Sequence, residues 1–184
     1  MTLKDKFKLI ADVITKKTSK DPIAIVTEIM HEDFISIHGP EHHFLDGAAF
    51  LVAYKNAGGK IDLPQALNEL AARAITMPGA MCGFWGVCGS TASLGASLAI
   101  INGTGPLSSD EFYKHNMEYT SNVIAKMSVI GGPRCCKRNA FLSIMSAVDF
   151  VNCKYAVKLD KSYPVCDFHS KNDQCLGQLC PFIK

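Results

Sequence analysis

The amino-acid sequence predicts a mainly α-helical fold, with a single helical domain over residues 1–157 and a short cysteine-rich tail over residues 158–184. Apolar residues recur with the period of an amphipathic helix through most of the first part, and the alternation that is typical of strands is nearly absent. Capping residues stand where several of these patterns begin. A length of 184 residues with 48% hydrophobic residues suits one domain with a complete core.

The first four helices are expected at residues 3–18, 22–30, 40–57 and 63–74. Asp21 and Pro22 open the second, since proline suits the first helical position. Pro40 opens the third for the same reason, and Gly58 ends it. Asp62 caps the fourth helix, whose apolar residues share one face.

Three further helices are expected at residues 90–102, 109–127 and 138–157. The first of them consists mostly of small residues, which allow close packing against neighbours, and Gly103 ends it. Ser108 and Glu111 form a capping box for the second. Beyond Val157 the periodicity is lost, and the tail is too poor in apolar surface to order itself. We therefore expect a bound metal or cross-links to hold the tail.

Composition and charge argue against several classes of protein. The net charge of +2 and the scattered basic residues do not indicate binding to nucleic acid. The N-terminal segment MTLKDKFKLIADVITKK lacks the apolar core of a signal peptide, and the apolar run over residues 87–101 is too short to span a membrane. We therefore expect a cytoplasmic protein whose eight cysteines serve as metal ligands rather than as disulfides.

Two glycine-rich loops carry cysteines directly before expected helices. GAMCGFWGVCG (79–89) contains Cys82 and Cys88, and GGPRCCKRNA (131–140) contains Cys135 and Cys136. Glycine lets backbone amides approach a sulfur atom or an anion, and a helix N-terminus favours thiolate. The separation of Cys82 and Cys88 is too wide for the usual structural zinc pair. Two such loops indicate a metal site, and the alternative is tight loops with buried free thiols.

Histidines gather in the segment SIHGPEHHFLDG (36–47). His38 lies in a turn, while His42, His43 and Asp46 fall on the first turns of the next helix, with His42 and Asp46 at i and i+4 on one face. These side chains are candidates for proton transfer, and imidazole is also the commonest metal ligand. The alternative is that the three histidines only cap and pack the start of the helix.

The tail region has a cysteine pattern of its own, Cys153-x12-Cys166-x8-Cys175-x4-Cys180, and a proline follows the last cysteine. Proline after a cysteine occurs in ferredoxin-type cluster motifs. Four cysteines in a segment that cannot order itself indicate a closed, four-ligand metal site, with His169 as a substitute for Cys153. Zinc and a second iron-sulfur cluster both remain open, although the gap of eight residues fits no common zinc finger.

Residues 79–150 resemble the cluster-binding region of iron-sulfur L-serine dehydratases. The resemblance rests on GAMCGFWGVCGSTASLGASLA, on the pair His115-Asn116 and on the spacing Cys135-x-x-Arg138-Asn139-Ala140. It implies a 4Fe-4S cluster with Cys82 as the first ligand and Cys135 as the last. Ser121 stands where that family has its middle cysteine, so Cys88 or Cys136 would supply the third thiolate.

The same resemblance implies an elimination on a small hydroxy, amino or thiol acid. An iron that lacks a protein thiolate acts as a Lewis acid while a base removes the proton next to the carboxylate. His38, His42 and His43 are the candidates for the base. Arg134 and Arg138 are the candidates for the group that binds the carboxylate.

The whole chain, with GPEHHFLDG, GAMCGFWGVCG, GGPRCCKRN and its CPF ending, also resembles DUF5714, a small domain of unassigned function in anaerobic bacteria and methanogenic archaea. These observations together predict a cytoplasmic protein with one or two 4Fe-4S clusters, acting as a lyase-like or sulfur-transferring enzyme. The alternatives are a non-catalytic iron-sulfur carrier or electron-transfer module, and a zinc-stabilised interaction domain. A small acid is the expected substrate and a redox or sulfur-transfer protein the expected partner; a homo-oligomer stays open.

Overall fold

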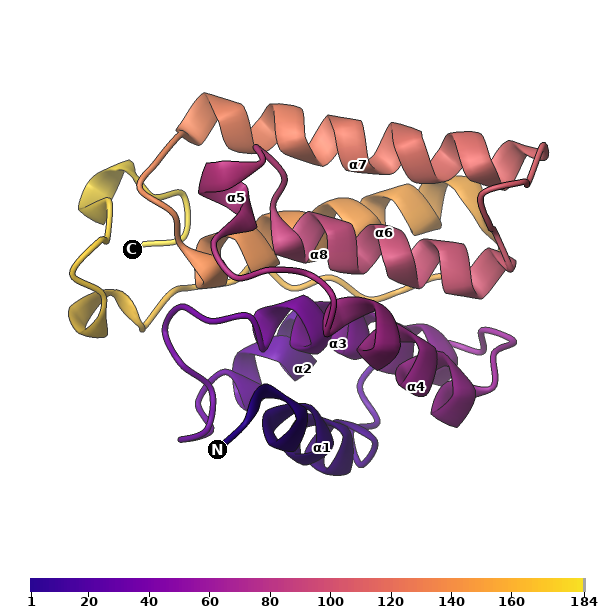
Figure 1. Cartoon of the computed structure of the whole chain (residues 1–184), viewed down its shortest axis with the longest axis horizontal. Coiled ribbons are helices and arrows are strands. Elements are labelled where there is room, and N and C mark those ends of the chain that lie inside the picture. The colour runs from indigo at the N-terminus through magenta and orange to yellow at the C-terminus, as the bar shows by residue number, and fades with distance from the viewer. Residues whose placement is uncertain (184) are drawn as a thin grey trace.

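The first four helices of the computed structural model lie on one side of the molecule, and α6, α7 and α8 lie on the other (Figure 1). The model describes residues 1–183, and these residues contain eight α-helices and no strand. The helices are α1 (Leu3–Ile14), α2 (Pro22–Ile29), α3 (His42–Asn56), α4 (Leu63–Ala74), α5 (Met81–Phe84), α6 (Gly89–Asn102), α7 (Glu111–Ile130) and α8 (Cys136–Lys154). Two short 3-10 turns, His169–Lys171 and Gly177–Leu179, follow in the tail. The predicted single helical domain is confirmed.

The centre of the fold is α3, in which every residue from His42 to Tyr54 is buried. A helix that is buried on all sides must be surrounded, and α3 contacts α1, α2, α4, α6 and α8. Its closest approach to α6 is at Gly47, where a Cβ atom would lie 2.6 Å from the hydroxyl oxygens of both Ser93 and Ser97. The small residues of α6 thus allow the two halves of the molecule to pack closely.

The helix ends follow the predicted caps with three exceptions. Pro40 does not open α3 as predicted, because the helix begins at His42 with Glu41 as its N-cap. Asp21 and Asp62 cap α2 and α4 through their carboxylates. Asp110, rather than Ser108, caps α7, because the Ser108 hydroxyl accepts a hydrogen bond from the amide of Gly105 instead. The last helix begins two residues earlier than expected, with Cys135 as its N-cap. The short helix α5 was not expected, since it is a single turn between glycines.

The tail packs onto the helical core through single apolar residues. Leu159, Phe168 and Phe182 are buried, and the Phe182 ring lies 5.4 Å from the ring of Phe141 on α8. The expectation that the tail lacks apolar surface to order itself is therefore wrong for these positions, because their spacing is irregular and leaves no periodic signal. No helix within residues 1–183 is long and apolar enough to cross a lipid bilayer.

Candidate functional site

The starts of α3, α6 and α8 meet at one cavity of about 270 Å³, which we call the polar cavity. The chain segments that form it are far apart in sequence: the histidine segment, the two glycine-cysteine loops and the first turns of the helices that follow them. Its lining includes His38, His42, His43, Cys82, Cys88, Ser90, Arg134, Cys135, Cys136 and Asn139. Most residues predicted to carry chemistry are thus brought together.

The electrostatics of the polar cavity follow from these helix starts. His42 and His43 begin α3, Gly89 begins α6, and Cys136 begins α8. The N-terminus of a long helix carries a partial positive charge and unpaired amide groups. Three such termini at one cavity favour an anion, a thiolate or a carboxylate there.

Two thiols of the cavity, those of Cys88 and Cys136, are half-buried and receive hydrogen bonds. Asn139 donates its side-chain amide to the Cys88 sulfur over 3.4 Å, and the backbone amides of Ser90 and Thr91 also point at it. Burial raises the pKa of Cys88, and it raises the pKa of Cys136 to about 12. Both groups are therefore neutral thiols at pH 7 unless a metal ion displaces the proton.

The three histidines differ in how their ring nitrogens are engaged. His38 Nε2 lies 3.0 Å from Asn172 Oδ1, and His38 Nδ1 accepts a hydrogen bond from the Cys136 amide over 3.4 Å. His43 is 7% exposed and its Nδ1 has no partner. Burial lowers the pKa of both His38 and His43, so both rings are neutral at pH 7. Of these two, only His43 has a ring nitrogen free for a ligand or a proton.

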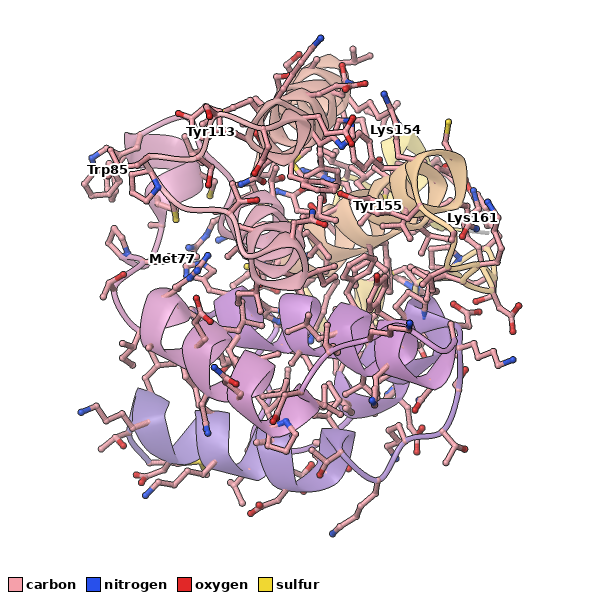
Figure 2. The ribbon with its side chains drawn as sticks, turned by 90° about the vertical axis from the view of Figure 1, so that its right-hand side faces the viewer. Met77, Trp85, Tyr113, Lys154, Tyr155 and Lys161 are labelled. Atoms are coloured by element: carbon pink, nitrogen blue, oxygen red, sulfur yellow. The ribbon has the colours of Figure 1, made fainter. Side chains whose placement is uncertain are left out.

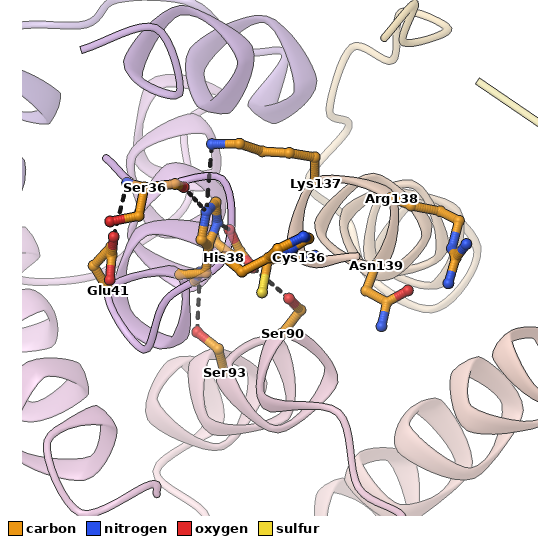
Figure 3. A network of polar contacts seen from close by, with 12 residues as sticks. Ser36, His38, Glu41, Ser90, Ser93, Cys136, Lys137, Arg138 and Asn139 are labelled. Carbon is orange, nitrogen blue, oxygen red and sulfur yellow. Dashed lines mark hydrogen bonds and ion pairs between the residues drawn. The ribbon is translucent and has the colours of Figure 1, made fainter. Parts of the chain in front are cut away.

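A chain of buried polar side chains links the starts of α8, α3 and α6, and Figure 3 shows its contacts as dashed lines. Lys137 Nζ lies 3.4 Å from His42 Nε2, His42 Nδ1 lies 3.4 Å from Asp46 Oδ1, and Ser90 donates to Asp46 over 2.5 Å. All four side chains are buried. Burial lowers the pKa of Lys137 to about 8. The i and i+4 pair in this chain was predicted from the sequence. The burial of Lys137 was not, since no local pattern marks it.

The two candidate carboxylate-binding arginines have different environments. Arg134 is exposed and lines the polar cavity. Arg138 is buried, and its Nη2 donates to the carbonyl oxygens of Gly131 and Pro133 over 3.0 and 2.8 Å. Arg138 therefore holds the loop before α8, while Arg134 is free to meet a ligand.

A second, small cavity lies under the tail, and we call it the tail cavity. Four cysteines line it: Cys135 from the start of α8 and Cys166, Cys175 and Cys180 from the tail. Cys153 is not among them; it is exposed near the C-terminal end of α8. Cys136 and Cys153 are 17 positions apart, which corresponds to about 26 Å of helix. His169 does line the tail cavity.

Several other residues line neither cavity. Phe84 and Trp85 are 79% and 62% exposed, and Trp85 lies at the outer edge of the molecule (Figure 2), so neither ring covers a thiol. His115 packs among Phe112, Phe150 and Tyr155. Ser121 is exposed on α7. The positions carried over from the dehydratases at His115 and Ser121 thus do not reach the site.

Within residues 1–183, no three histidine, cysteine, aspartate or glutamate side chains form a group that could hold a metal ion as they stand. The chain belongs to a family of unknown function, DUF5714, whose family model matches residues 10–183. No curated protein and no solved structure matches the chain. The likeness to serine dehydratases therefore stays a prediction.

Proposed function

We propose that this protein binds a 4Fe-4S cluster in the polar cavity through Cys82, Cys88 and Cys136, and that it acts there on a small hydroxy, amino or thiol acid. The observation that carries the proposal is the composition of that cavity. Four thiols, three histidines and an arginine from distant segments line one space at three helix starts. A volume of about 270 Å³ is several times the roughly 30 Å³ that one water molecule occupies.

The donor set suits a cluster with one open iron. Cys135 also lines the tail cavity, and its sulfur accepts a hydrogen bond from Asn172 of the tail over 3.6 Å. Assigning Cys135 to the tail leaves three thiols for the polar cavity, one fewer than a fully ligated cluster needs. When bound, such a cluster supplies a Lewis acid for a carboxylate and a leaving group. The thiol side chains have to turn toward one centre to bind it.

Protein side chains would accept the proton, bind the substrate carboxylate and position the cavity wall. His43, with its free Nδ1, is the proton acceptor, since its neutral ring can take a proton at pH 7. Arg134 binds the substrate carboxylate, which the helix termini also favour. His38 and His42, whose ring nitrogens contact Asn172, Asp46 and other groups, position the cavity wall.

A second candidate function is an electron-transfer carrier. The exposed pair Phe84 and Trp85 stands next to Cys82, and its rings meet edge to face at 6.0 Å. Exposed aromatic residues are typical of protein interfaces, and a redox or sulfur-transfer protein could dock there beside the cluster. Either function suits the reducing cytoplasm that the sequence predicts.

Anaerobic purification with iron and sulfide counting tests the proposal. We expect about four irons and four sulfides per chain, and Cys82→Ala, Cys88→Ala and Cys136→Ala should each lose most of them. Cys153→Ala, at the exposed end of α8, is the matched control and should keep the full content. Full cluster content in all three cavity variants would exclude this ligand set.

Addition of a small acid to the loaded protein then distinguishes an enzyme from an electron-transfer carrier. L-serine or L-cysteine should perturb the visible spectrum of the cluster in the enzyme, and His43→Gln should abolish turnover while the spectrum persists. A loaded protein whose spectrum responds to no small acid would be the carrier.

A further inference from the structure

The tail cavity has the composition of a metal site but the size of a single ion. Its volume is about 10 Å³, which is close to the space for one water-sized sphere. The thiols of Cys135, Cys166, Cys175 and Cys180 all line this space. Three of them come from the tail and one from the N-cap of α8. A cubane cluster needs far more room, whereas a single tetrahedral ion takes four such ligands.

Two buried cations beside the tail cavity, Lys137 and Arg138, make no direct ion pair within the described residues. Lys137 is 1% exposed and Arg138 is 4% exposed, and both line the cavity. None of the ion pairs among residues 1–183 includes either of them. Lys137 lies 4.8 Å from the centre of the Phe168 ring, and Arg138 Nε has no hydrogen-bond partner. The carboxylates of Asp46 and Glu41 act on Lys137 from the side of α3, and an anion in the tail cavity would stabilise both buried cations from the other side.

The sulfur atoms receive hydrogen bonds that suit thiolates. Cys135 accepts from the amide of Arg138 over 3.5 Å and from the Asn172 side chain over 3.6 Å. Cys175 accepts from the amide of Gly177 over 3.4 Å, and Gly177 has a φ of +56°, which favours glycine. Hydrogen bonds to the charged form of a group stabilise that form.

We infer that Cys135, Cys166, Cys175 and Cys180 bind one divalent ion, zinc in particular, in a tetrahedral site that fastens the tail to the start of α8. The four side chains do not converge on one point as they stand, so they turn toward one centre as the ion binds. The four thiols give up their protons as the ion binds. Four thiolates and one divalent cation leave a net charge of −2, which Lys137 and Arg138 balance. This site is independent of the cluster proposed for the polar cavity.

The site also explains how the tail reaches the polar cavity. Asn172 lies between Cys166 and Cys175, and it contacts both the Cys135 sulfur and His38 Nε2. An ion on the flanking cysteines fixes Asn172, and Asn172 in turn orients the His38 ring. Loss of the ion should therefore disturb the wall of the polar cavity as well as the tail.

Metal analysis of the full chain tests the inference. Protein produced in zinc-supplemented medium should contain one zinc per chain, and Cys175→Ser and Cys180→Ser should each reduce it at least tenfold. Cys153→Ser should retain one zinc. Zinc retained in both tail variants, or lost in Cys153→Ser, would overturn the site. So would iron and sulfide, rather than zinc, disappearing with Cys175→Ser and Cys180→Ser.

A second measurement needs no substitution and so does not depend on whether a variant folds. Apo-protein is alkylated with iodoacetamide with and without one equivalent of zinc, and peptide mapping gives the rate at each cysteine. We expect zinc to slow alkylation of the four tail-cavity cysteines at least tenfold and to leave Cys82 and Cys88 unchanged. Equal rates with and without zinc would refute the inference, whatever the cluster content of the polar cavity.

Discussion

Glu41→Gln should lower the free energy of unfolding, because it removes the charge of Glu41 from its ion pair with Lys6. Glu41 is 2% exposed; its Oε1 lies 2.7 Å from Lys6 Nζ of α1 and accepts from the Ser36 amide over 2.8 Å. Burial alone would raise the pKa of Glu41, but the hydrogen bonds from Lys6 and from the amides of Glu41 and Ser36 lower it to about 2. The carboxylate thus ties α1 to the loop that carries His38.

The magnitude follows from the two pKa values. The folded pKa of about 2 lies below the ordinary value of 4.5, so the stabilisation is present above pH 4.5 and is lost as the pH falls toward 2. At about 1.4 kcal/mol for each tenfold change in an equilibrium constant, the carboxylate contributes about 3 kcal/mol at neutral pH. By the same relation between pKa and stability, the carboxylate contributes about 1 kcal/mol at pH 3.

Urea unfolding followed by circular dichroism at several pH values measures this contribution. We expect Glu41→Gln to lower the free energy of unfolding by about 3 kcal/mol at pH 7 and by about 1 kcal/mol at pH 3. Glu28→Gln is the matched control, because Glu28 pairs with Lys17 but is 62% exposed, and its effect should stay below about 1 kcal/mol. The reasoning would be refuted if the difference in unfolding free energy between wild type and Glu41→Gln did not change with pH.

Three further changes test other parts of the structure. In Gly89→Ala the new Cβ would lie 2.2 Å from the His43 ring, so the ring should move and its NMR signals should shift; Gly79→Ala, which meets nothing within 4 Å, should leave them in place. Chelation of the proposed tail ion should speed tryptic cleavage after Lys161 at least tenfold, and an unchanged rate would argue against the ion. Phe141→Ala, fully buried on α8, should lower the free energy of unfolding by about 3–5 kcal/mol in urea, and a loss below 1 kcal/mol would contradict its place in the core.

The sequence predicts local features of this protein well and long-range ones poorly. Helical periodicity and caps place the helices within a few residues, and the i and i+4 spacing correctly predicts the contact of His42 with Asp46. The burial of Lys137 depends on Phe168 of the tail, and the orientation of His38 depends on Asn172, 134 residues away. Such contacts leave no periodic trace, because they are fixed only when the tail folds back over α8.

The cysteine assignments show the same limit, with one exception. Nothing local to GGPRCC indicates that Cys135 lines both cavities while Cys136 lines only the polar cavity, since that depends on which way α8 leaves the loop. The exception is the distance of Cys153 from the other cysteines. This distance could be predicted, because the length of a continuous helix follows from its residue count. A helix expected to run through residue 157 already implied that separation.

The two walls of the polar cavity differ in stiffness because of where they come from. One wall is the first turn of α3, which is packed on every side, so displacing His42 or His43 would require the whole core to yield. Another part of the lining is the loop that begins at the exposed Gly79, where a Cβ would meet no neighbour within 4 Å. A ligand therefore enters the cavity from the loop side. His42 and His43 keep their positions and orient the ligand as it binds.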